Sequence, residues 1–349
     1  PRSSVGYCSP KNYPSLADKL YRNLGAGRFA DISSSAGIAG ALGAGLGVVA
    51  DDFDGNGSVD FYVANDGVEN VLWMNQGNAT FVEDAVLAGV SVNGNAAPES
   101  SMGVAAADFD RDGDVDLFLT HLITETNTLY VNDGDGNFID ASMRTRIAAS
   151  SLRFTGFGTG WIDVDNDGSL DLFAANGAVS YIKEQVAAGI SLPLKLRNQL
   201  WLNNARGSYV EVDAGPAFDL NEVSRGASFS DLDNDGDMDI VVTNNAGPVR
   251  LYRNDTPPAH WLGLSLTGSR EWPQITGSLV WRETEPLYRM RVRTDGSYAS
   301  AMDSRVLIGL GDDDSAQSIG VRWPDGTIQR FGPLEVDRYH VLQRASRIK

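Results

Sequence analysis

The sequence predicts an all-β protein in which a β-propeller built from repeated blades precedes a small C-terminal β domain. Two observations lead to this fold class: an aspartate-rich nonapeptide recurs four times in one context, and short stretches of β-prone residues flank each copy. Self-similarity at a fixed period is typical of repeat architectures, in which each repeat is one unit that buries its faces against its neighbours.

The repeats share one order of elements. The nonapeptides begin at Asp52, Asp108, Asp163 and Asp231, at spacings of 56, 55 and 68 residues. Each is followed by four apolar residues such as FYVA or LFLT, which are too few for a helix. In the first three repeats, an aromatic-containing strand, a turn of Asn and Gly, and a further strand come next. Each repeat therefore provides about four strands, the size of one propeller blade.

The nonapeptide, D-x-D-x-[DN]-G-[SD]-x-D, predicts a calcium site. Its alternate positions carry oxygen atoms, and Ca²⁺ takes about six to eight oxygen ligands. The glycine at position 6 allows the sharp turn that such a loop requires. We expect positions 1, 3, 5, 7 and 9 to supply side-chain or backbone oxygens to about four ions in all, one per loop. These residues are Asp52, Asp54, Asn56, Ser58 and Asp60 in the first loop, Asp108, Asp110, Asp112, Asp114 and Asp116 in the second, Asp163, Asp165, Asp167, Ser169 and Asp171 in the third, and Asp231, Asp233, Asp235, Asp237 and Asp239 in the fourth.

Two other interpretations of these loops are less consistent with the sequence. An EF-hand requires a glutamate at position 12 and a helix on each side. Position 12 is Val63, Leu119, Ala174 or Val242, each inside an apolar β-like stretch, so the aspartate at position 9 closes the site instead. Solvated aspartate-rich turns are the simpler alternative. The seventeen carboxylates of the four nonapeptides would then repel one another without a counter-ion.

Charge is distributed unevenly along the chain, whose net charge is −18. Residues 1–259 carry 16 basic and 35 acidic residues, whereas residues 260–349 carry 12 and 11. The first part lacks the basic face that nucleic acid requires, which argues against a nucleic-acid partner and favours metal cations. No apolar run reaches the roughly 18 residues of a membrane span. Cys8 is the only cysteine, so no intrachain disulfide forms.

The aspartate loops, with their G-x-x-x-x-D lead-in and apolar exit, resemble the FG-GAP or VCBS repeat, a calcium-bearing blade unit. The stretch YCSPKNYPSLADKLYRNLGAGRFADISSSAGI at residues 7–38 resembles a segment of the cartilage acidic protein family. HWLGLSLTG, GSYASAMDSRVLIGLG and VRWPDGT near the C-terminus resemble the ASPIC/UnbV domain. The resemblance implies metal binding at the loop positions named above, and it implies no catalytic residue.

Two positions depart from the family pattern. Relatives often carry a histidine after an Asn-Gly pair in the third repeat, but Ala178 follows that pair here. Any role of that histidine is therefore absent. His121 stands where the other repeats have asparagine, and we expect it to replace that asparagine in a turn rather than to bind a metal.

The predicted organisation is a repeat region at residues 1–258 and an ASPIC/UnbV-like β domain at residues 259–349. Residues 19–31 resemble the second half of a repeat, and residues 250–254 begin another such half. These halves either pair into a composite blade that closes a small ring, or the array belongs to a larger propeller and leaves an unpaired apolar edge at its first blade. We expect the second arrangement, because four or so blades are few for a closed ring.

Two further features have open interpretations. The third repeat is longer than the others because of an insertion near residues 181–196, whose first part up to Gly189 predicts a short helix. The insertion either shapes a ligand-binding rim or is a surface loop without that role. In the C-terminal part, residues 319–330 predict a β-hairpin. Four tryptophans there form either a sugar-stacking platform or, as we expect, part of the core.

Two classes of function are consistent with the sequence. The one we expect is an extracytoplasmic calcium-binding adhesion or scaffold module, located outside the cell, in the periplasm or at the cell surface, that binds a protein or a glycan. Weak calcium loops suit the millimolar calcium outside cells. The alternative is an enzyme or an enzyme's accessory domain, active on glycans or in natural-product biosynthesis. Against catalysis, the sequence has no nucleophile elbow, phosphate-binding glycine loop or histidine-rich metal triad.

Overall fold

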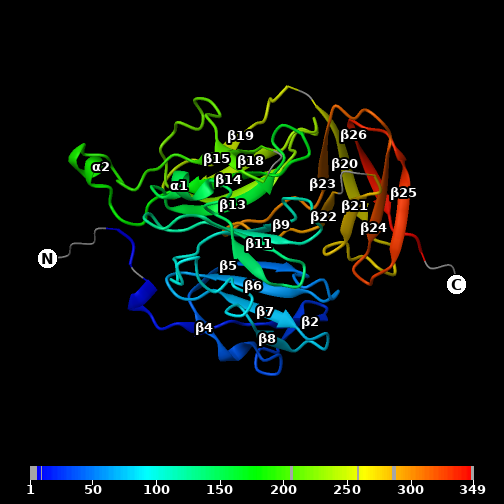
Figure 1. Ribbon diagram of the computed structural model, residues 1–349, viewed down its shortest axis with the longest axis horizontal. Helices are drawn as coiled ribbons and strands as arrows, with labels where there is room; N and C mark the ends of the chain where they lie inside the picture. Colours follow the sequence, from blue (N-terminus) through cyan, green and yellow to red (C-terminus); the bar gives the residue numbers. More distant parts are fainter. Residues whose placement is uncertain (1–5, 9, 205–206, 258, 285–287, 347–349) are drawn as a thin grey trace.

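The computed structural model describes residues 6–8, 10–204, 207–257, 259–284 and 288–346, and nearly all of its regular structure is β-sheet (Figure 1). The all-β fold class is therefore confirmed. The described residues include no helix that is both long and apolar enough to cross a membrane.

Four blades follow one another along the chain, each an antiparallel meander whose strands pair in chain order. Blades 1 to 3 have four strands each, as predicted, and blade 4 has three within the described residues. Blade 1 comprises β5 (Gly45–Asp51), β6 (Asp60–Asn65), β7 (Val71–Asn75) and β8 (Phe81–Glu83), and blade 2 comprises β9 (Val104–Ala107), β10 (Asp116–Leu119), β11 (Thr128–Asn132) and β12 (Phe138–Asp140). Blade 3 comprises β13 (Gly156–Ile162), β14 (Asp171–Asn176), β15 (Gln199–Asn203) and β16 (Tyr209–Glu211), and blade 4 comprises β17 (Ser224–Ser230), β18 (Asp239–Asn244) and β19 (Arg250–Tyr252).

Each nonapeptide connects the first and second strands of its blade. Its last aspartate is the first residue of the second strand, as Asp60 is in β6 and Asp116 is in β10. Position 12 lies inside that strand in every blade, where an EF-hand would have a helix. The EF-hand is therefore excluded by the structure as well as by the sequence.

The second strand of blade 2 and that of blade 3 are each buried on both faces. In β10, Leu117 and Leu119 pack against blade 1, whereas Phe118 packs against blade 3. In β14, Leu172 packs toward blade 2 and Phe173 toward blade 4. Side chains alternate between the faces of a strand, so a continuous apolar run such as LFLT supplies both interfaces. The blades consequently stack face to face, which is consistent with an incomplete propeller.

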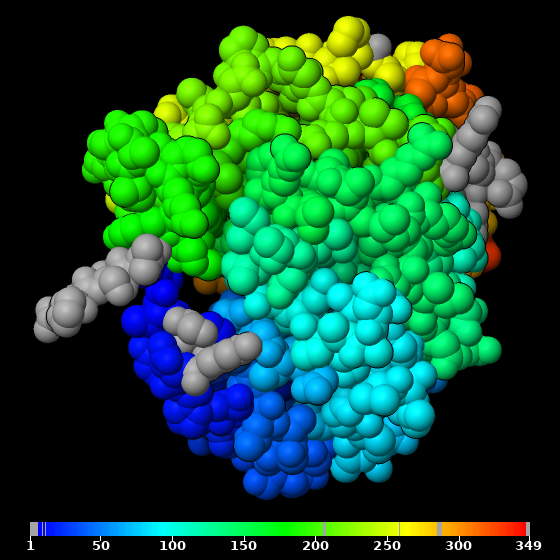
Figure 2. All heavy atoms as spheres, turned by 60° about the vertical axis from the view of Figure 1, so that its left-hand side comes forward, coloured from blue at the N-terminus to red at the C-terminus, as the bar shows by residue number. Residues whose placement is uncertain are grey.

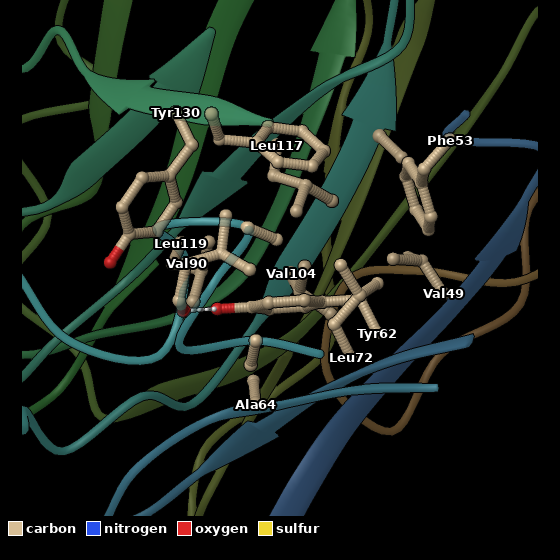
Figure 3. Close-up of a cluster of buried hydrophobic side chains, with 14 residues drawn as sticks. Val49, Phe53, Tyr62, Ala64, Leu72, Val90, Val104, Leu117, Leu119 and Tyr130 are labelled. Atoms are coloured by element: carbon tan, nitrogen blue, oxygen red, sulfur yellow. Dashed lines mark hydrogen bonds between the residues drawn. The ribbon is translucent and has the colours of Figure 1, made fainter. Parts of the chain in front are cut away.

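Figure 3 shows the core between blades 1 and 2. Tyr62 and Leu72 of blade 1 meet Leu117 and Tyr130 of blade 2, and all four are 0 or 1% exposed. The Tyr62 hydroxyl donates a hydrogen bond of 3.0 Å to the carbonyl of Val90, in the connection between the blades. A buried phenol thus has its polar atom satisfied, as a buried polar group requires.

The C-terminal part forms two packed sheets, which stand beside the blades in Figure 1. Their shared core includes the fully buried Leu264, Ile308 and Val321. The hairpin predicted at residues 319–330 is present as β24 and β25. One sheet comprises β20 (His260–Thr267), β23 (Val306–Gly311) and β26 (Arg338–Gln343), and the other comprises β21 (Leu279–Arg282), β22 (Arg289–Arg291), β24 (Gln317–Arg322) and β25 (Ile328–Leu334).

The tryptophans of this part do not form a platform together. Trp323 is 1% exposed and packs in the core of the two sheets, and Trp261 is 8% exposed. The core interpretation therefore holds for both of these residues.

Residues 293–303 of the C-terminal part, here called the axial segment, cross the first strands of the blades (Figure 1). The single residue Ser297 contacts three blades. Its main chain pairs with Val104 in β9, and its hydroxyl accepts the N–H of Thr159 in β13 at 3.0 Å and donates to the carbonyl of Ala227 in β17 at 2.8 Å. The axial segment therefore occupies the centre around which the blades are arranged.

Buried charges fix the axial segment to blade 1. Asp51, at the end of β5, is 1% exposed; it accepts a hydrogen bond from Arg291 at 2.5 Å and forms an ion pair with Arg293 at 3.2 Å. Arg293 also donates to the main-chain carbonyls of Ala50 and Ala106, in blades 1 and 2. A buried carboxylate is tolerated in a protein only when it is paired in this way.

The N-terminal part does not complete blade 4, so the composite blade considered above is wrong for the described residues. β2 (Tyr21–Gly25) and β3 (Arg28–Asp31) form a two-stranded sheet of their own, and β19 pairs only with β18. Leu20 and Ile32 pack this sheet against blade 1. Tyr21, Leu24 and Phe29 of this sheet are 55, 52 and 61% exposed, so the sheet leaves apolar side chains at the surface.

The remaining short elements lie between the sheets of the N-terminal part and after blade 2. They are the 3-10 turns η1 (Pro10–Asn12) and η2 (Ile38–Gly40), the paired strands β1 (Leu16–Ala17) and β4 (Leu42–Gly43), and the helix α1 (Ile147–Ser151) after blade 2.

The insertion of the third repeat contains the predicted helix, α2 (Lys183–Ala187). The N–H of Gly189, with a φ of 68°, closes its C-terminal end on the carbonyl of Val186. None of the helix residues is buried. Figure 2 shows the insertion projecting beside the N-terminal segment, where the N–H of Tyr7 donates to the carbonyl of Val179 at 2.8 Å.

Removing an inter-blade side chain should destabilise the whole array. Leu172 is fully buried between blades 2 and 3, so Leu172→Ala should lower the free energy of unfolding by about 2–5 kcal/mol. The matched control is Leu87→Ala, at a position 82% exposed, which should change it by less than about 0.5 kcal/mol. Chemical denaturation measures both, and equal effects would contradict the stacked arrangement.

Arg293→Met tests whether the axial segment anchors the blades. The substitution leaves the buried Asp51 with one arginine, and breaking a buried pair costs about 3–5 kcal/mol. Arg338→Met, which removes an exposed pair with Glu335, should cost less than about 1 kcal/mol. If denaturation finds the two variants equally stable, the axial segment does not hold the blades together.

Candidate metal centres

Four clusters of carboxylates lie at the blade loops, one in each nonapeptide. In every loop, positions 1, 3 and 9 each bring a carboxylate oxygen within 4.8 Å of the other two. These triads are Asp52, Asp54 and Asp60, then Asp108, Asp110 and Asp116, then Asp163, Asp165 and Asp171, and finally Asp231, Asp233 and Asp239. The structure thus brings together three of the five positions that the sequence indicates.

The aspartate at position 1 holds the turn, and in the second and third loops it also keeps an oxygen free. Its carboxylate accepts the N–H of the glycine at position 6, for example from Gly113 to Asp108 at 3.1 Å and from Gly168 to Asp163 at 2.9 Å. The second oxygen, Oδ1, of Asp108 and of Asp163 is buried and has no hydrogen-bond partner. A buried oxygen without a partner is costly, and a bound cation would satisfy it.

The aspartate at position 9 connects the loop to two other parts of its blade. In blade 2, Asp116 is 0% exposed; one oxygen accepts the N–H of Phe109 at 3.2 Å and the other that of Asn132 at 3.0 Å. Phe109 belongs to the loop, and Asn132 ends the third strand. Asp60, Asp171 and Asp239 make the same two bonds in the other blades.

Sequence analysis assigned no role to the asparagine that ends the third strand of blades 1 to 3 and lies two residues beyond it in blade 4. In blade 2, the amide of Asn132 donates to the carbonyl of Val115 in its own loop and to that of Phe53 in the loop of blade 1, at 3.0 and 2.8 Å. The repeated L-[WY]-x-N pattern was the available signal. The four equivalent residues are Asn75, Asn132, Asn203 and Asn254.

Positions 5 and 7 make contacts within and between loops. The side chain at position 5 accepts the N–H of position 7, as from Ser169 to Asp167 at 2.6 Å. At position 7, Ser169 accepts a hydrogen bond from Arg111 of the second loop at 3.2 Å. Asp237 of the fourth loop likewise accepts one from Asn166 of the third loop at 2.8 Å. Neighbouring loops are therefore linked by side chains at this position.

Burial and mutual repulsion make these carboxyls weak acids in the absence of a cation. Burial raises the pKa of Asp108 to about 7 and that of Asp171 to about 7, and the charges of nearby aspartates add to the effect. Burial also raises the pKa of Asp116 to about 9 and of Asp60 to about 6, against the hydrogen bonds from backbone N–H groups. These raised pKa values favour the protonated carboxyl groups. A bound cation would lower the pKa values and favour the charged carboxylates instead.

Two family models match the chain. Residues 268–349 match the family described as ASPIC and UnbV, and residues 52–119 match an FG-GAP-like repeat. The C-terminal part is thus similar to the ASPIC/UnbV family, and the first two aspartate loops are similar to an FG-GAP-like repeat. The first residue of the repeat match is Asp52, so the match begins at the first aspartate loop and ends at Leu119, inside β10.

Cartilage acidic protein 1 of Mus musculus is 28% identical over 314 residues, which cover 85% of this chain and 44% of that protein. The Homo sapiens protein of the same name is 27% identical over 305 residues, with 85 and 43% coverage. The chain thus spans less than half the length of these relatives. A structure solved for specific recognition of non-reducing terminal N-acetylglucosamine by an Agrocybe aegerita lectin aligns at a TM-score of 0.31 and 16% identity, over 69% of this chain and 75% of that one.

The ASPIC/UnbV segment lies directly against the aspartate loops. Tyr339 donates its hydroxyl to Oδ2 of Asp231 at 2.8 Å, and the N–H of Gly311 donates to the carbonyl of Asn166 at 2.7 Å. Arg289 donates to the carbonyl of Gly113 at 3.2 Å. The loops of blades 2, 3 and 4 therefore each contact this segment through a hydrogen bond.

Close packing reinforces this contact at the fourth loop. The indole of Trp261, in β20, lies so near Gly236 that a Cβ at that position would come within 1.9 Å of it. Gly236 has a φ of 95°, so position 6 requires glycine here for its conformation as well as for its contact.

His121 belongs to a buried polar cluster away from the aspartate triads. Its Nε2 lies 3.1 Å from the Ser101 hydroxyl and 3.6 Å from Glu99, and burial lowers its pKa to about 3. Serine and acid face the same ring nitrogen, whereas a catalytic triad needs them on opposite nitrogens. The N–H of His121 bonds to Asn127 as that of Asn65 bonds to Asn70. His121 thus takes the structural place of the asparagine.

The raised pKa values predict how the metal-free chain responds to pH. Four aspartates have pKa values of about 6 to 9 in the folded chain, whereas an ordinary aspartate has a pKa of 3.8; they are Asp60, Asp108, Asp116 and Asp171. Between these pH values the folded chain therefore binds more protons than the unfolded chain. The free energy of unfolding should therefore fall as pH rises from about 4 to 8. Urea denaturation in chelator at several pH values measures it, and a rise over this range would contradict the assignment. Asp116→Asn should flatten the dependence.

Proposed function

We propose that the chain is an extracytoplasmic calcium-binding scaffold that presents a surface to a protein or a glycan, and that calcium is structural. The observation that carries this proposal is the pair of buried, partnerless oxygens on Asp108 and Asp163, each within a carboxylate triad. A hard cation prefers such oxygens. Among the described residues, no donor forms a hydrogen bond to either of these two oxygens.

Each ion would be held by the triad at positions 1, 3 and 9, with the oxygens of positions 5 and 7 completing the shell. The loop residues named from the sequence are the proposed ligands. Calcium fits better than a transition metal, because the described triads offer carboxylate oxygens and no histidine or cysteine. The ion would stabilise the loop, and the aspartate at position 9 would pass that restraint to the strands it connects.

Similarity supports the location and the role. Cartilage acidic protein 1 is named for a tissue matrix, and weak calcium sites suit the millimolar calcium outside cells. FG-GAP-like repeats are consistent with a binding scaffold. We also propose that the repeat region ends at residue 258 and that a separate β domain begins at residue 259. Residue 258 itself lies outside the described residues, and the axial segment joins the two parts.

Calcium should stabilise the protein in proportion to site occupancy. Binding at a concentration one hundred times Kd contributes about 2.7 kcal/mol per site. Chelator should therefore lower Tm by several degrees or more, and calorimetric titration should find about four ions. An unchanged Tm in chelator together with no heat of calcium binding would remove the proposal.

Asp108→Asn tests one site against the others. The substitution removes the charge that faces the triad of the second loop, so the stoichiometry should fall by one ion and the Tm gain with calcium should shrink. The matched control is Asp133→Asn, at an exposed turn outside the nonapeptides, where asparagine can accept the same turn hydrogen bonds. An equal loss of calcium in both variants would show general electrostatic attraction instead of a defined site.

A further inference from the structure

A cavity of about 270 Å³ lies where blade 1, blade 2 and the C-terminal sheets meet. Its lining combines two opposite chemistries. Aspartates come from the blades and arginines come from the C-terminal sheets. The charged lining residues are Asp51, Asp52, Asp108, Asp114, Arg289, Arg291, Arg293 and Arg322.

The four arginines differ in how many hydrogen-bond and ion-pair partners they have. Arg291 and Arg293 are committed to Asp51 and to main-chain carbonyls, as described above. Arg289 is exposed and donates only to Gly113, and Arg322 is half-buried without any hydrogen-bond or ion-pair partner among the described residues. A guanidinium has five N–H donors, so these two side chains bring spare donors to the cavity.

Arg322 and the aspartate loop of blade 1 both line the cavity. Arg322 lines the cavity from β24, and Asp52 lines it from the first loop. The cavity is therefore a place where an arginine with free donors faces an acidic wall across space that a ligand can fill.

The acidic wall restricts the kind of ligand. Arginine recognises carboxylates with paired hydrogen bonds, but a bare inorganic anion would also meet repulsion from Asp114. Hydroxyl groups, in contrast, donate hydrogen bonds to that carboxylate. A ligand that carries one carboxylate and several hydroxyls is complementary to both walls.

The volume of the cavity and its apolar lining further restrict the class of ligand that it can hold. Ligand pockets usually measure about 300–1,000 Å³, so this one is small and holds about one sugar ring. Leu279 and Met290 provide apolar lining. Apolar surface of this kind packs against the C–H face of a ring, while the polar groups fix its orientation.

We propose that this cavity binds the uronic-acid residue of an acidic glycan, with its carboxylate on Arg322 and Arg289 and its hydroxyls toward Asp114. This proposal rests on the proposed function, because calcium in the first two loops neutralises Asp52 and Asp108, which line the cavity. The junction of the blades with the C-terminal sheets is then the ligand-binding part of the scaffold.

The test is calorimetric or ligand-observed NMR titration of the full chain in calcium, with D-glucuronate as the probe. Glucose and acetate are the comparison ligands, since each lacks one half of the required chemistry. Glucuronate should bind at least about tenfold more tightly than either. Equal binding of glucose, or of acetate, would overturn the proposal, and so would no binding of glucuronate.

Arg322→Gln should weaken glucuronate binding at least about tenfold while leaving Tm unchanged, because the side chain has no partner to lose. Arg330→Gln, in an exposed pair with Glu283 outside the cavity, is the matched control and should bind as the unaltered chain does. Unchanged binding in Arg322→Gln would reject the assignment.

Calcium binding is measured in the same samples. If calcium binds and raises Tm but glucuronate does not bind, the cavity proposal fails and the proposed scaffold function stands. If calcium itself does not bind, the proposed function fails as well.

Discussion

Each blade depends on one buried carboxylate. The aspartate at position 9 begins the second strand, and its two oxygens accept backbone N–H groups from the loop and from the end of the third strand. Three segments of one blade are thereby held at a single residue, and the bond recurs in all four blades. The cost is that further aspartates crowd around a buried charge, and their charges add to burial in raising the pKa of Asp116 and Asp171. The calcium that we propose would relieve this repulsion and would link metal binding to folding.

The second constraint acts between the two parts of the chain. The blades are strongly acidic, and the C-terminal part supplies the arginines that meet them. Asp51 is buried between Arg291 and Arg293, and Ser297 bonds to three blades from the centre of the array. The first strands of neighbouring blades contact one another, and the axial segment adds hydrogen bonds that link three of these strands through one residue.

These two constraints meet at the junction of the loops with the C-terminal sheets. The loops lie against the ASPIC/UnbV segment, where Tyr339 donates to Asp231, so the C-terminal sheets contact the same residues that we propose as calcium ligands. The buried cluster of Glu99, Ser101 and His121 has the residue types of a catalytic site without its geometry.

The sequence by itself determined what is local or repeated: the aspartate loop, the exclusion of the EF-hand through Val63 and its equivalents, and the blade of about four strands. The apolar run in β10 also predicted burial on both faces, because alternation is a local property. Only the tertiary structure decided the rest. Arg291 meets Asp51 across 240 residues, and no period or motif encodes that pairing. It likewise showed that β2 and β3 form their own sheet instead of completing blade 4, since which edges pair depends on the packing of the whole array.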